Sequence, residues 1–116
     1  MATVHIFASV GRFASFEQLR AFIDPTYTED GDAIPSVFIR EVQLTEFDPS
    51  CIEAIFSKRT VPLVKLLEGA SYCDQWLSRL PRNSQANAAI CVFEPNLVQK
   101  PFDGSLEYCG AFTYIP

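Results

Sequence analysis

One histidine and four cysteines are the side chains best suited to covalent or metal chemistry in this sequence. His5 lies between Val4 and Ile6 in an apolar stretch, a setting more typical of a structural histidine in a strand than of a catalytic one. The cysteines stand at positions 51, 73, 91 and 109. Zinc sites use closely spaced cysteine pairs, and no such pair occurs here. We expect four buried, reduced thiols and no metal or cofactor, with a Cys–His dyad formed across the fold as an open alternative.

Carboxylates are the other groups able to do chemistry, and they are concentrated in one third of the chain. Residues 21–57 carry a net charge of −7, because Arg40 alone opposes eight acids, whereas the whole chain carries −5. A pair of these acids could serve a hydrolase, but no spacing selects a pair. Asp30 and Asp32 lack the closing glutamate of a calcium loop. The acids are Asp24, Glu29, Asp30, Asp32, Glu41, Glu46, Asp48 and Glu53.

This charge distribution favours some partners and disfavours others. A carboxylate-rich surface repels phosphate backbones, so we do not expect a nucleic acid as a direct ligand. It attracts a basic protein and speeds the encounter with it. The alternative is a solvated face that only keeps the protein soluble. The single glycine at Gly11, after the first apolar segment, does not make a phosphate-binding loop.

Length and composition predict one folded domain covering residues 1–116. Hydrophobic residues make up 48% of the chain, enough for a core that needs no disulfide or metal. No run of 18 apolar residues is present, so we expect no membrane partner. The first residues lack the basic segment of a secretory signal, and we therefore expect a cytoplasmic location.

The first half of the chain predicts a strand followed by helices. Residues 3–10 are rich in β-branched and aromatic side chains, which is typical of a strand. Ser15 and Gln18 form a capping-box pattern, which predicts a helix over 16–23 that ends before Pro25. Residues 24–35 form a long, acidic loop. Ser36 is placed to cap a short helix through residue 42.

The second half is more ambiguous at its start. Residues 47–56 fit either a helix capped by Asp48 or a strand with alternating apolar residues, and we favour the strand. A turn is expected at residues 58–59, then a helix from Pro62 to Gly69 and another capped by Ser71. Strands are predicted at 88–93 and 106–115, and Gly110 indicates either a bulge or a close backbone approach. The order indicates an α+β fold, a small antiparallel or mixed sheet with helices packed mainly on one face.

Several short patches resemble one protein family. They begin with an N-terminal strand ending near Gly11 and continue through Phe16-Glu17-Gln18-Leu19, Ser36-Val37-Phe38, Phe47-Asp48, Glu53-Ala54, Leu67-Glu68-Gly69-Ala70-Ser71-Tyr72, Ile90-Cys91-Val92-Phe93 and Tyr108-Cys109-Gly110-Ala111-Phe112. In these patches the chain resembles the immunity protein 22 family, small α+β proteins linked to bacterial polymorphic-toxin systems. It departs from the family pattern at Phe7, where tryptophan is usual, and at Pro49-Ser50, where a second acid is usual.

The resemblance implies a cytoplasmic antitoxin that binds and neutralises a cognate toxin and performs no chemistry itself. The charge map agrees independently, because toxin domains that cut nucleic acid are often basic and carboxylates mimic phosphate. Exposed aromatic residues would supply the anchors of such an interface. The predicted partner-binding residues are Asp24, Tyr27, Glu29, Asp30, Asp32, Glu46, Asp48, Glu53, Tyr72 and Trp76.

Two other functions stay open at this point, and the oligomeric state is left undecided. One is a small carboxylate- or Cys-based enzyme or ligand-binding domain, which a deep pocket joining His5, Asp48 and Glu53 would favour. The other is a homo-oligomer that uses the last strand as an exposed edge.

Overall fold

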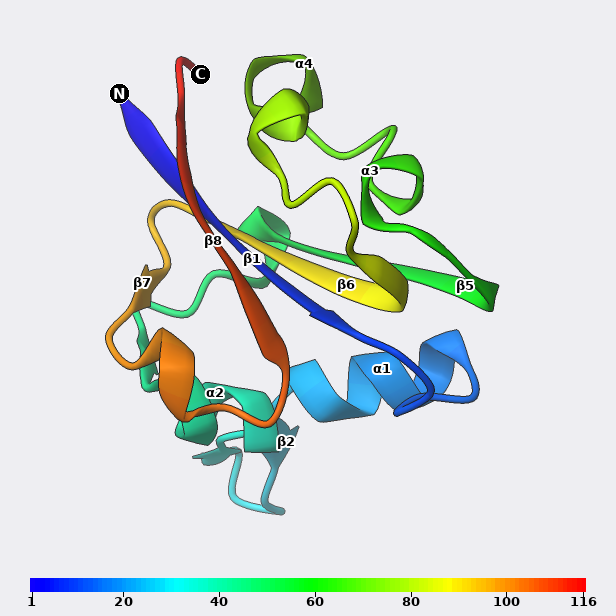
Figure 1. Ribbon diagram of the computed structural model, residues 1–116. Helices are drawn as coiled ribbons and strands as arrows, with labels where there is room; N and C mark the ends of the chain where they lie inside the picture. Colours follow the sequence, from blue (N-terminus) through cyan, green and yellow to red (C-terminus); the bar gives the residue numbers. More distant parts are fainter.

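A four-stranded antiparallel sheet occupies the centre of the protein (Figure 1). The computed structural model describes all residues, 1–116. The strand order is β5 (Ile52–Pro62), β6 (Gln85–Phe93), β1 (Ala2–Ser9) and β8 (Glu107–Tyr114). Ile6 of β1 lies opposite Cys91 of β6 on one side and Gly110 of β8 on the other. The N-terminal strand β1 is therefore central in the sheet, and the C-terminal strand β8 lies beside it at the edge.

Helices cover both faces of this sheet. Helices α1 (Phe16–Ile23) and α2 (Val37–Val42) pack on one face, and α3 (Leu63–Leu66) and α4 (Cys73–Trp76) pack on the other. The α+β class and the antiparallel sheet are confirmed, but the expectation that helices lie mainly on one face is wrong. Strand β6 gives the reason, since it is buried from Ala86 to Phe93. A strand that is apolar on both sides needs cover on both sides.

Alternating residues of β6 divide the interior into two cores. Ala89, Cys91 and Phe93 point into the core beneath α3 and α4. Ala88, Ile90 and Val92 point into the core beneath α1 and α2. Because successive side chains of a strand point to opposite faces, the apolar run 88–93 supplies residues to both cores.

The caps of the first two helices are as the sequence predicts. The Oγ of Ser15 accepts the backbone N–H of Gln18 at 3.1 Å, and the Gln18 side chain accepts the N–H of Ala14 at 2.8 Å. The Oγ of Ser36 accepts the N–H of Ile39 at 3.1 Å. These bonds satisfy N–H groups that have no partner within the helix.

The ambiguous segment 47–56 contains both a turn of helix and a strand. Asp48 caps the short helix η1 (Pro49–Cys51), and β5 begins directly after it, so the preference for a strand is confirmed. The turn expected at residues 58–59 is wrong. Strand β5 continues through them because its register against β6 shifts between Phe56 and Val61, which leaves residues 58–60 exposed without ending the strand.

The helical region after β5 is shorter than predicted. Helix α3 ends at Leu66, and α4 begins only at Cys73. Ser71 does not cap α4, because its N–H and Oγ both donate to the Glu53 carboxylate instead. The N-cap residue of α4 is Tyr72, which has a left-handed backbone with φ of 58° and makes no side-chain capping bond. The 3-10 helix η2 (Leu77–Arg79) follows.

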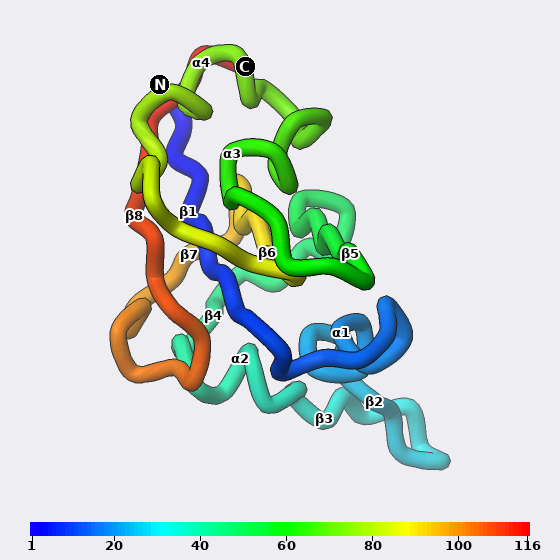
Figure 2. Tube along the Cα trace, turned by 45° about the vertical axis from the view of Figure 1, so that its right-hand side comes forward, coloured from blue at the N-terminus to red at the C-terminus, as the bar shows by residue number.

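Small elements complete the chain. The predicted loop 24–35 contains a hairpin of β2 (Thr26–Tyr27) and β3 (Ala33–Ile34), which projects from the body at the end farthest from the chain termini (Figure 2). Strands β4 (Leu44–Thr45) and β7 (Leu97–Val98) pair, and η3 (Pro101–Asp103) precedes β8. None of the helices has the length and apolarity needed to cross a bilayer.

The edge strand β8 carries a bulge, the first of the two features that Gly110 indicates. Its register against β1 shifts between Ile6 and Phe7, and Gly110 has φ of 126°. Side chains of the α4 region also occupy its outer edge. Arg79 donates to the Thr113 carbonyl at 2.9 Å, and Gln75 exchanges two hydrogen bonds with the Ile115 backbone. Bulges and covered backbone groups are features that discourage edge-to-edge pairing.

Candidate functional site

The predicted partner-binding residues do not form one patch. Tyr27, Glu29, Asp30 and Asp32 lie on the projecting hairpin of residues 26–34, here called the acidic hairpin. Glu53 and Tyr72 line a groove with a volume of about 520 Å³, here called the aromatic groove. It lies at the end of the molecule where the chain termini lie. The lining residues of the groove are Ala2, Ser50, Cys51, Glu53, Ser71, Tyr72, Phe93, Glu94, Pro95, Leu97, Tyr114 and Pro116.

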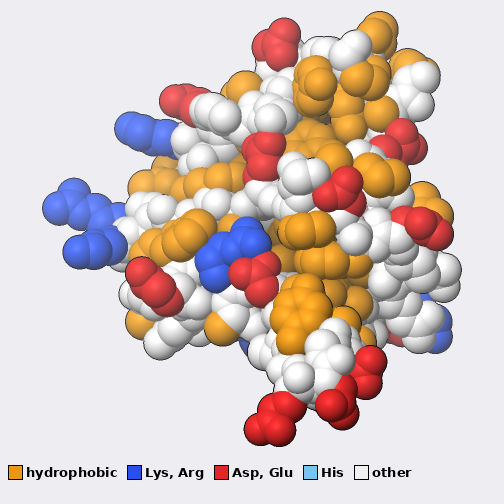
Figure 3. All heavy atoms as spheres, turned by 180° about the vertical axis from the view of Figure 1, so that it is seen from behind, with side chains coloured by type: hydrophobic (Ala, Val, Ile, Leu, Met, Phe, Trp, Pro, Cys, Tyr) orange, Lys and Arg blue, Asp and Glu red, His pale blue; other side chains and the backbone are white.

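The acidic hairpin is held by bonds within its own turn. The N–H of Thr28 donates to the Asp32 carbonyl at 2.9 Å, and the N–H of Asp32 donates to the Thr28 hydroxyl at 3.1 Å. Every residue from 26 to 35 is exposed, and Tyr27 exposes 67% of its surface. The three acids of the turn have no ion-pair partner, and Figure 3 shows acidic side chains at the projecting tip. Their charges therefore face solvent uncompensated.

Asp24 differs from these acids because it is neutralised locally. Its carboxylate pairs with the guanidinium of Arg20, one helical turn earlier, in the only ion pair of the structure. This pair closes the end of α1 and leaves no surplus charge at that point. Asp24 therefore belongs to the end of α1 and does not add to the negative charge of the hairpin.

Glu46 and Asp48 belong to neither the acidic hairpin nor the lining of the aromatic groove. Asp48 is next to the groove, because it contacts Ser50. Its carboxylate accepts the N–H of Ser50 at 3.0 Å and the Ser50 hydroxyl at 2.6 Å, and Ser50 lines the groove. These hydrogen bonds from Ser50 hold the pKa of Asp48 below its usual value. Glu46 is exposed and has a left-handed backbone with φ of 56°.

Three aromatic rings form the apolar part of the groove. The rings of Tyr72 and Tyr114 stack with centroids 4.7 Å apart and an interplanar angle of 22°. Phe93 meets Tyr114 edge to face at 5.6 Å. Strand ends supply Phe93 and Tyr114, whereas Tyr72 comes from the loop before α4. The groove therefore depends on segments that are distant in sequence.

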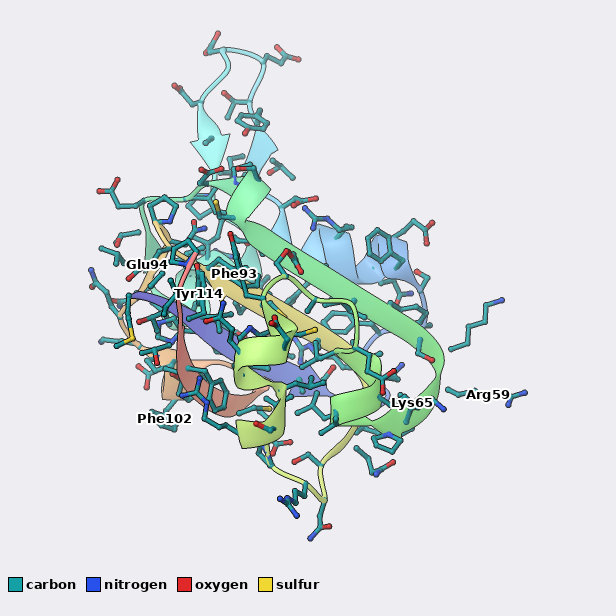
Figure 4. All side chains as sticks on the ribbon, turned by 90° about the horizontal axis from the view of Figure 1, so that it is seen from above. Arg59, Lys65, Phe93, Glu94, Phe102 and Tyr114 are labelled. Carbon is teal, nitrogen blue, oxygen red and sulfur yellow. The ribbon has the colours of Figure 1, made fainter.

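Two carboxylates, those of Glu53 and Glu94, line the same groove. Glu53 accepts the N–H of Ser71 at 3.0 Å and also its hydroxyl, which fixes the loop that carries Tyr72. Glu94 is exposed and forms no ion pair. Its charge raises the pKa of Tyr114, although burial of that phenol is the larger cause. Figure 4 shows Phe93, Glu94 and Tyr114 together at one end of the sheet.

Sequence reasoning missed Glu94, Phe93 and Tyr114 as site residues. Glu94 lies outside the acidic third of the chain, so the charge pattern does not single it out. Phe93 and Tyr114 carry the signature of core strands, and both are indeed largely buried. The one available signal was that Phe93 ends a predicted strand and Tyr114 lies one residue before the end of another. Their proximity follows from sheet pairing that the sequence does not specify.

The prediction of Trp76 as an exposed anchor is wrong. Its side chain is fully buried in the core beneath α4, and its indole N–H donates to the Ser71 carbonyl at 3.2 Å. A residue with 0% exposure does not contact a partner. Its part is structural, because its indole and the Glu53 carboxylate both bind Ser71 in the loop before α4.

His5 has a structural environment, as the sequence indicated. Its Nδ1 lies 2.9 Å from the Tyr108 hydroxyl. Burial lowers the pKa of His5, and the charge of Glu94 partly opposes that shift. His5 does not line the aromatic groove. The arrangement that would favour an enzyme, a pocket joining His5, Asp48 and Glu53, is not formed.

The four cysteines are free and pack in or against the core beneath α3 and α4. Cys91 is fully buried, whereas the other three cysteines are half-buried. The prediction of a buried thiol is therefore confirmed for Cys91 only. Burial raises the pKa of Cys91, and burial with the charge of Glu107 raises the pKa of Cys109 to about 12. Both thiols are poor nucleophiles at neutral pH. No group of three ligands is arranged to hold a metal.

A second hollow lies beside α4 and η2 and has about the same volume, 530 Å³. Asp74 and Arg82 give it one charge of each sign, and its other lining residues are Val64, Leu77, Ser78 and Leu80. Balanced charge and the absence of aromatic rings distinguish it from the aromatic groove. It has no evident preference for a charged ligand.

The fold and its surfaces define a small α+β protein with a projecting acidic hairpin and an acidic, aromatic groove. The model of the family Immunity protein 22 matches residues 4–114, and the chain belongs to this family. Family membership confirms the resemblance seen in the short sequence patches and assigns the chain to the immunity proteins. No curated protein and no solved structure matches the chain significantly.

Proposed function

We propose that this protein is a cytoplasmic antitoxin that neutralises a cognate toxin by binding it, with the acidic hairpin guiding a basic face of that toxin. Family membership supports the immunity role. The unpaired acids at the hairpin turn are the observation that supports the guiding role. Neutralisation is by occupancy, and the protein itself performs no reaction.

The hairpin is suited to fast, charge-guided association. Glu29, Asp30 and Asp32 fall within four residues on a segment that projects into solvent. Like charges crowded on a projection create a field that extends about a Debye length, roughly 8 Å at physiological salt. Such a field raises the association rate with a basic partner and falls with salt. Tyr27, beside the acids, adds an exposed aromatic contact.

The test uses the product of the neighbouring gene as the toxin. Co-expression should restore growth of cells that produce the toxin, and the purified proteins should form a complex. The triple variant Glu29→Lys, Asp30→Lys and Asp32→Lys should lower the association rate roughly tenfold or more at low salt. Its salt dependence should flatten, because the attraction that salt screens has been removed.

A matched control separates the hairpin from the net charge of the protein. The triple variant Glu17→Lys, Glu68→Lys and Asp103→Lys reverses three acids on exposed positions elsewhere. Both variants change the net charge by the same amount. Equal loss of association in the two would assign the effect to overall charge, and failure of the wild type to bind or protect would contradict the antitoxin role.

A further inference from the structure

We propose that the aromatic groove is a pocket for one arginine side chain of the toxin. This inference rests on the proposed antitoxin function and adds a second contact to it. In Figures 1 and 2 the hairpin of β2 and β3 lies at the end opposite the chain termini, and Ala2 and Pro116 beside those termini line the groove. No residue of the hairpin, 26–34, lines the groove, so the two contacts are separate.

Charge is the first argument for a cationic occupant. Glu53 and Glu94 both line the groove, and no lysine, arginine or histidine does. The labelled bases Arg59 and Lys65 lie at the opposite end of the sheet in Figure 4. Glu94 forms no ion pair, and each oxygen of Glu53 accepts one bond from Ser71 and keeps a further lone pair. A guest cation therefore meets two carboxylates that lack a positive partner.

The aromatic lining selects arginine over lysine. Tyr72 stacks on Tyr114 and still exposes 41% of its surface, so part of this residue stays accessible to a guest. A planar guanidinium stacks on aromatic rings and also donates two parallel hydrogen bonds to a carboxylate. A lysine ammonium is more strongly hydrated and has no plane to stack. The combination of Tyr72 with Glu94 fits the guanidinium.

The groove has room for an arginine side chain together with part of the chain that carries it. At about 520 Å³ the groove lies within the range of roughly 300–1,000 Å³ that is usual for small-ligand sites. Leu97, which also lines the groove, exposes 51% of its surface and is therefore available for apolar contact with the chain that carries the arginine. Pockets that combine an apolar body with a few placed charges give orientation and specificity.

The groove is built before a partner arrives. Tyr72 has a left-handed backbone with φ of 58°, a conformation that costs free energy in a bulky residue. Two contacts hold it there, because Glu53 binds the Ser71 N–H and hydroxyl while the Trp76 indole binds the Ser71 carbonyl. A residue kept in a costly conformation by its neighbours is typical of a preorganised binding site.

The first experiment measures toxin affinity. Glu94→Gln removes the free carboxylate at nearly constant volume and should weaken the complex about tenfold, chiefly through faster dissociation. Tyr72→Leu should have a similar effect. The control Glu68→Gln makes the same change at an exposed acid outside the groove and should leave affinity within about twofold. If the wild type binds but neither groove variant differs from the control, the inference is wrong and the antitoxin function stands.

The second experiment needs no toxin. The aromatic resonances of Tyr72 and Tyr114 are followed by NMR while Nα-acetyl-arginine amide is added, with the citrulline analogue as the neutral, planar control. Saturable shifts with the arginine compound, absent with citrulline and lost in Glu94→Gln, support the pocket. No shifts, or equal shifts with both compounds, overturn it. Arginine binding by a protein that fails to bind the toxin would instead contradict the antitoxin function alone.

Discussion

The acidic hairpin and the aromatic groove are both acidic, yet they are built in opposite ways. The hairpin holds itself by bonds within the turn 28–32 and exposes every residue from 26 to 35. The groove combines the end of β6, the end of β8 and the loop before α4, which are distant in the sequence. One surface is local and projecting, whereas the other is nonlocal and concave.

This difference separates two parts of recognition. Exposed charges on a projection act at a distance, so they change the rate of encounter and respond to salt. Aromatic rings and carboxylates in a preformed concavity act on contact, so they change the rate of dissociation. An antitoxin with both surfaces would capture its toxin quickly and release it slowly. The following changes test that contrast.

The largest effect is expected from Trp76→Ala. Loss of a fully buried indole should lower the free energy of unfolding by about 3–5 kcal/mol. The groove should be disturbed as well, because the Trp76 N–H supports Ser71. Urea denaturation followed by circular dichroism measures the loss. Trp76→Phe should lose less, and a change below about 1 kcal/mol for the alanine variant would contradict the core assignment.

A smaller effect is expected from Glu53→Ala. The change removes the acceptor for both the N–H and the hydroxyl of Ser71, and we expect a loss of roughly 1–2 kcal/mol in unfolding free energy. Ser71→Ala removes one of the two bonds. A double-mutant cycle should show strongly non-additive losses, since both changes break the same contact. Additive losses would mean that the contact does not hold the loop.

A still smaller effect on stability is expected from shortening the hairpin. Replacement of residues 28–32 by Asn-Gly gives a two-residue turn suited to a hairpin. Because the removed residues are all exposed, the free energy of unfolding should stay within about 0.5 kcal/mol. Association with the toxin should nevertheless slow and lose much of its salt dependence. Stopped-flow kinetics at two salt concentrations measures this, and an unchanged rate would remove the hairpin from the encounter.

The smallest effect concerns the pKa of His5. Burial lowers this pKa, so the unfolded chain takes up a proton near pH 6.5 while the folded chain resists it. The resulting stability is present above pH 6.5 and is lost as the pH falls toward the folded pKa. Glu94 opposes the shift, so Glu94→Gln should lower the pKa further, as an NMR titration of the imidazole would show. The hairpin variant should leave it unchanged, and a raised pKa in Glu94→Gln would contradict this.

Local signals were sufficient for much of the fold. The Ser15 and Ser36 caps, the apolar run 88–93 and the bulge at Gly110 were each predicted from neighbouring residues and are present. Ser71 is the informative failure. It has the chemistry of a helix cap, but the Glu53 carboxylate competes for its donors and wins. That competitor is eighteen residues away, and no local rule contains it.

The sequence by itself determined the central strands, the caps of the first two helices, the family and the acids of residues 29–32, because capping, periodicity and turn chemistry act between residues a few positions apart. Tertiary structure decided which acids remain free, that Trp76 is buried, and that Glu94 stands beside Tyr114 and Tyr72. The physical reason is that burial and charge pairing depend on which strands become neighbours. In the order β5-β6-β1-β8, residues from both ends of the chain meet at one end of the sheet, and the groove exists only there.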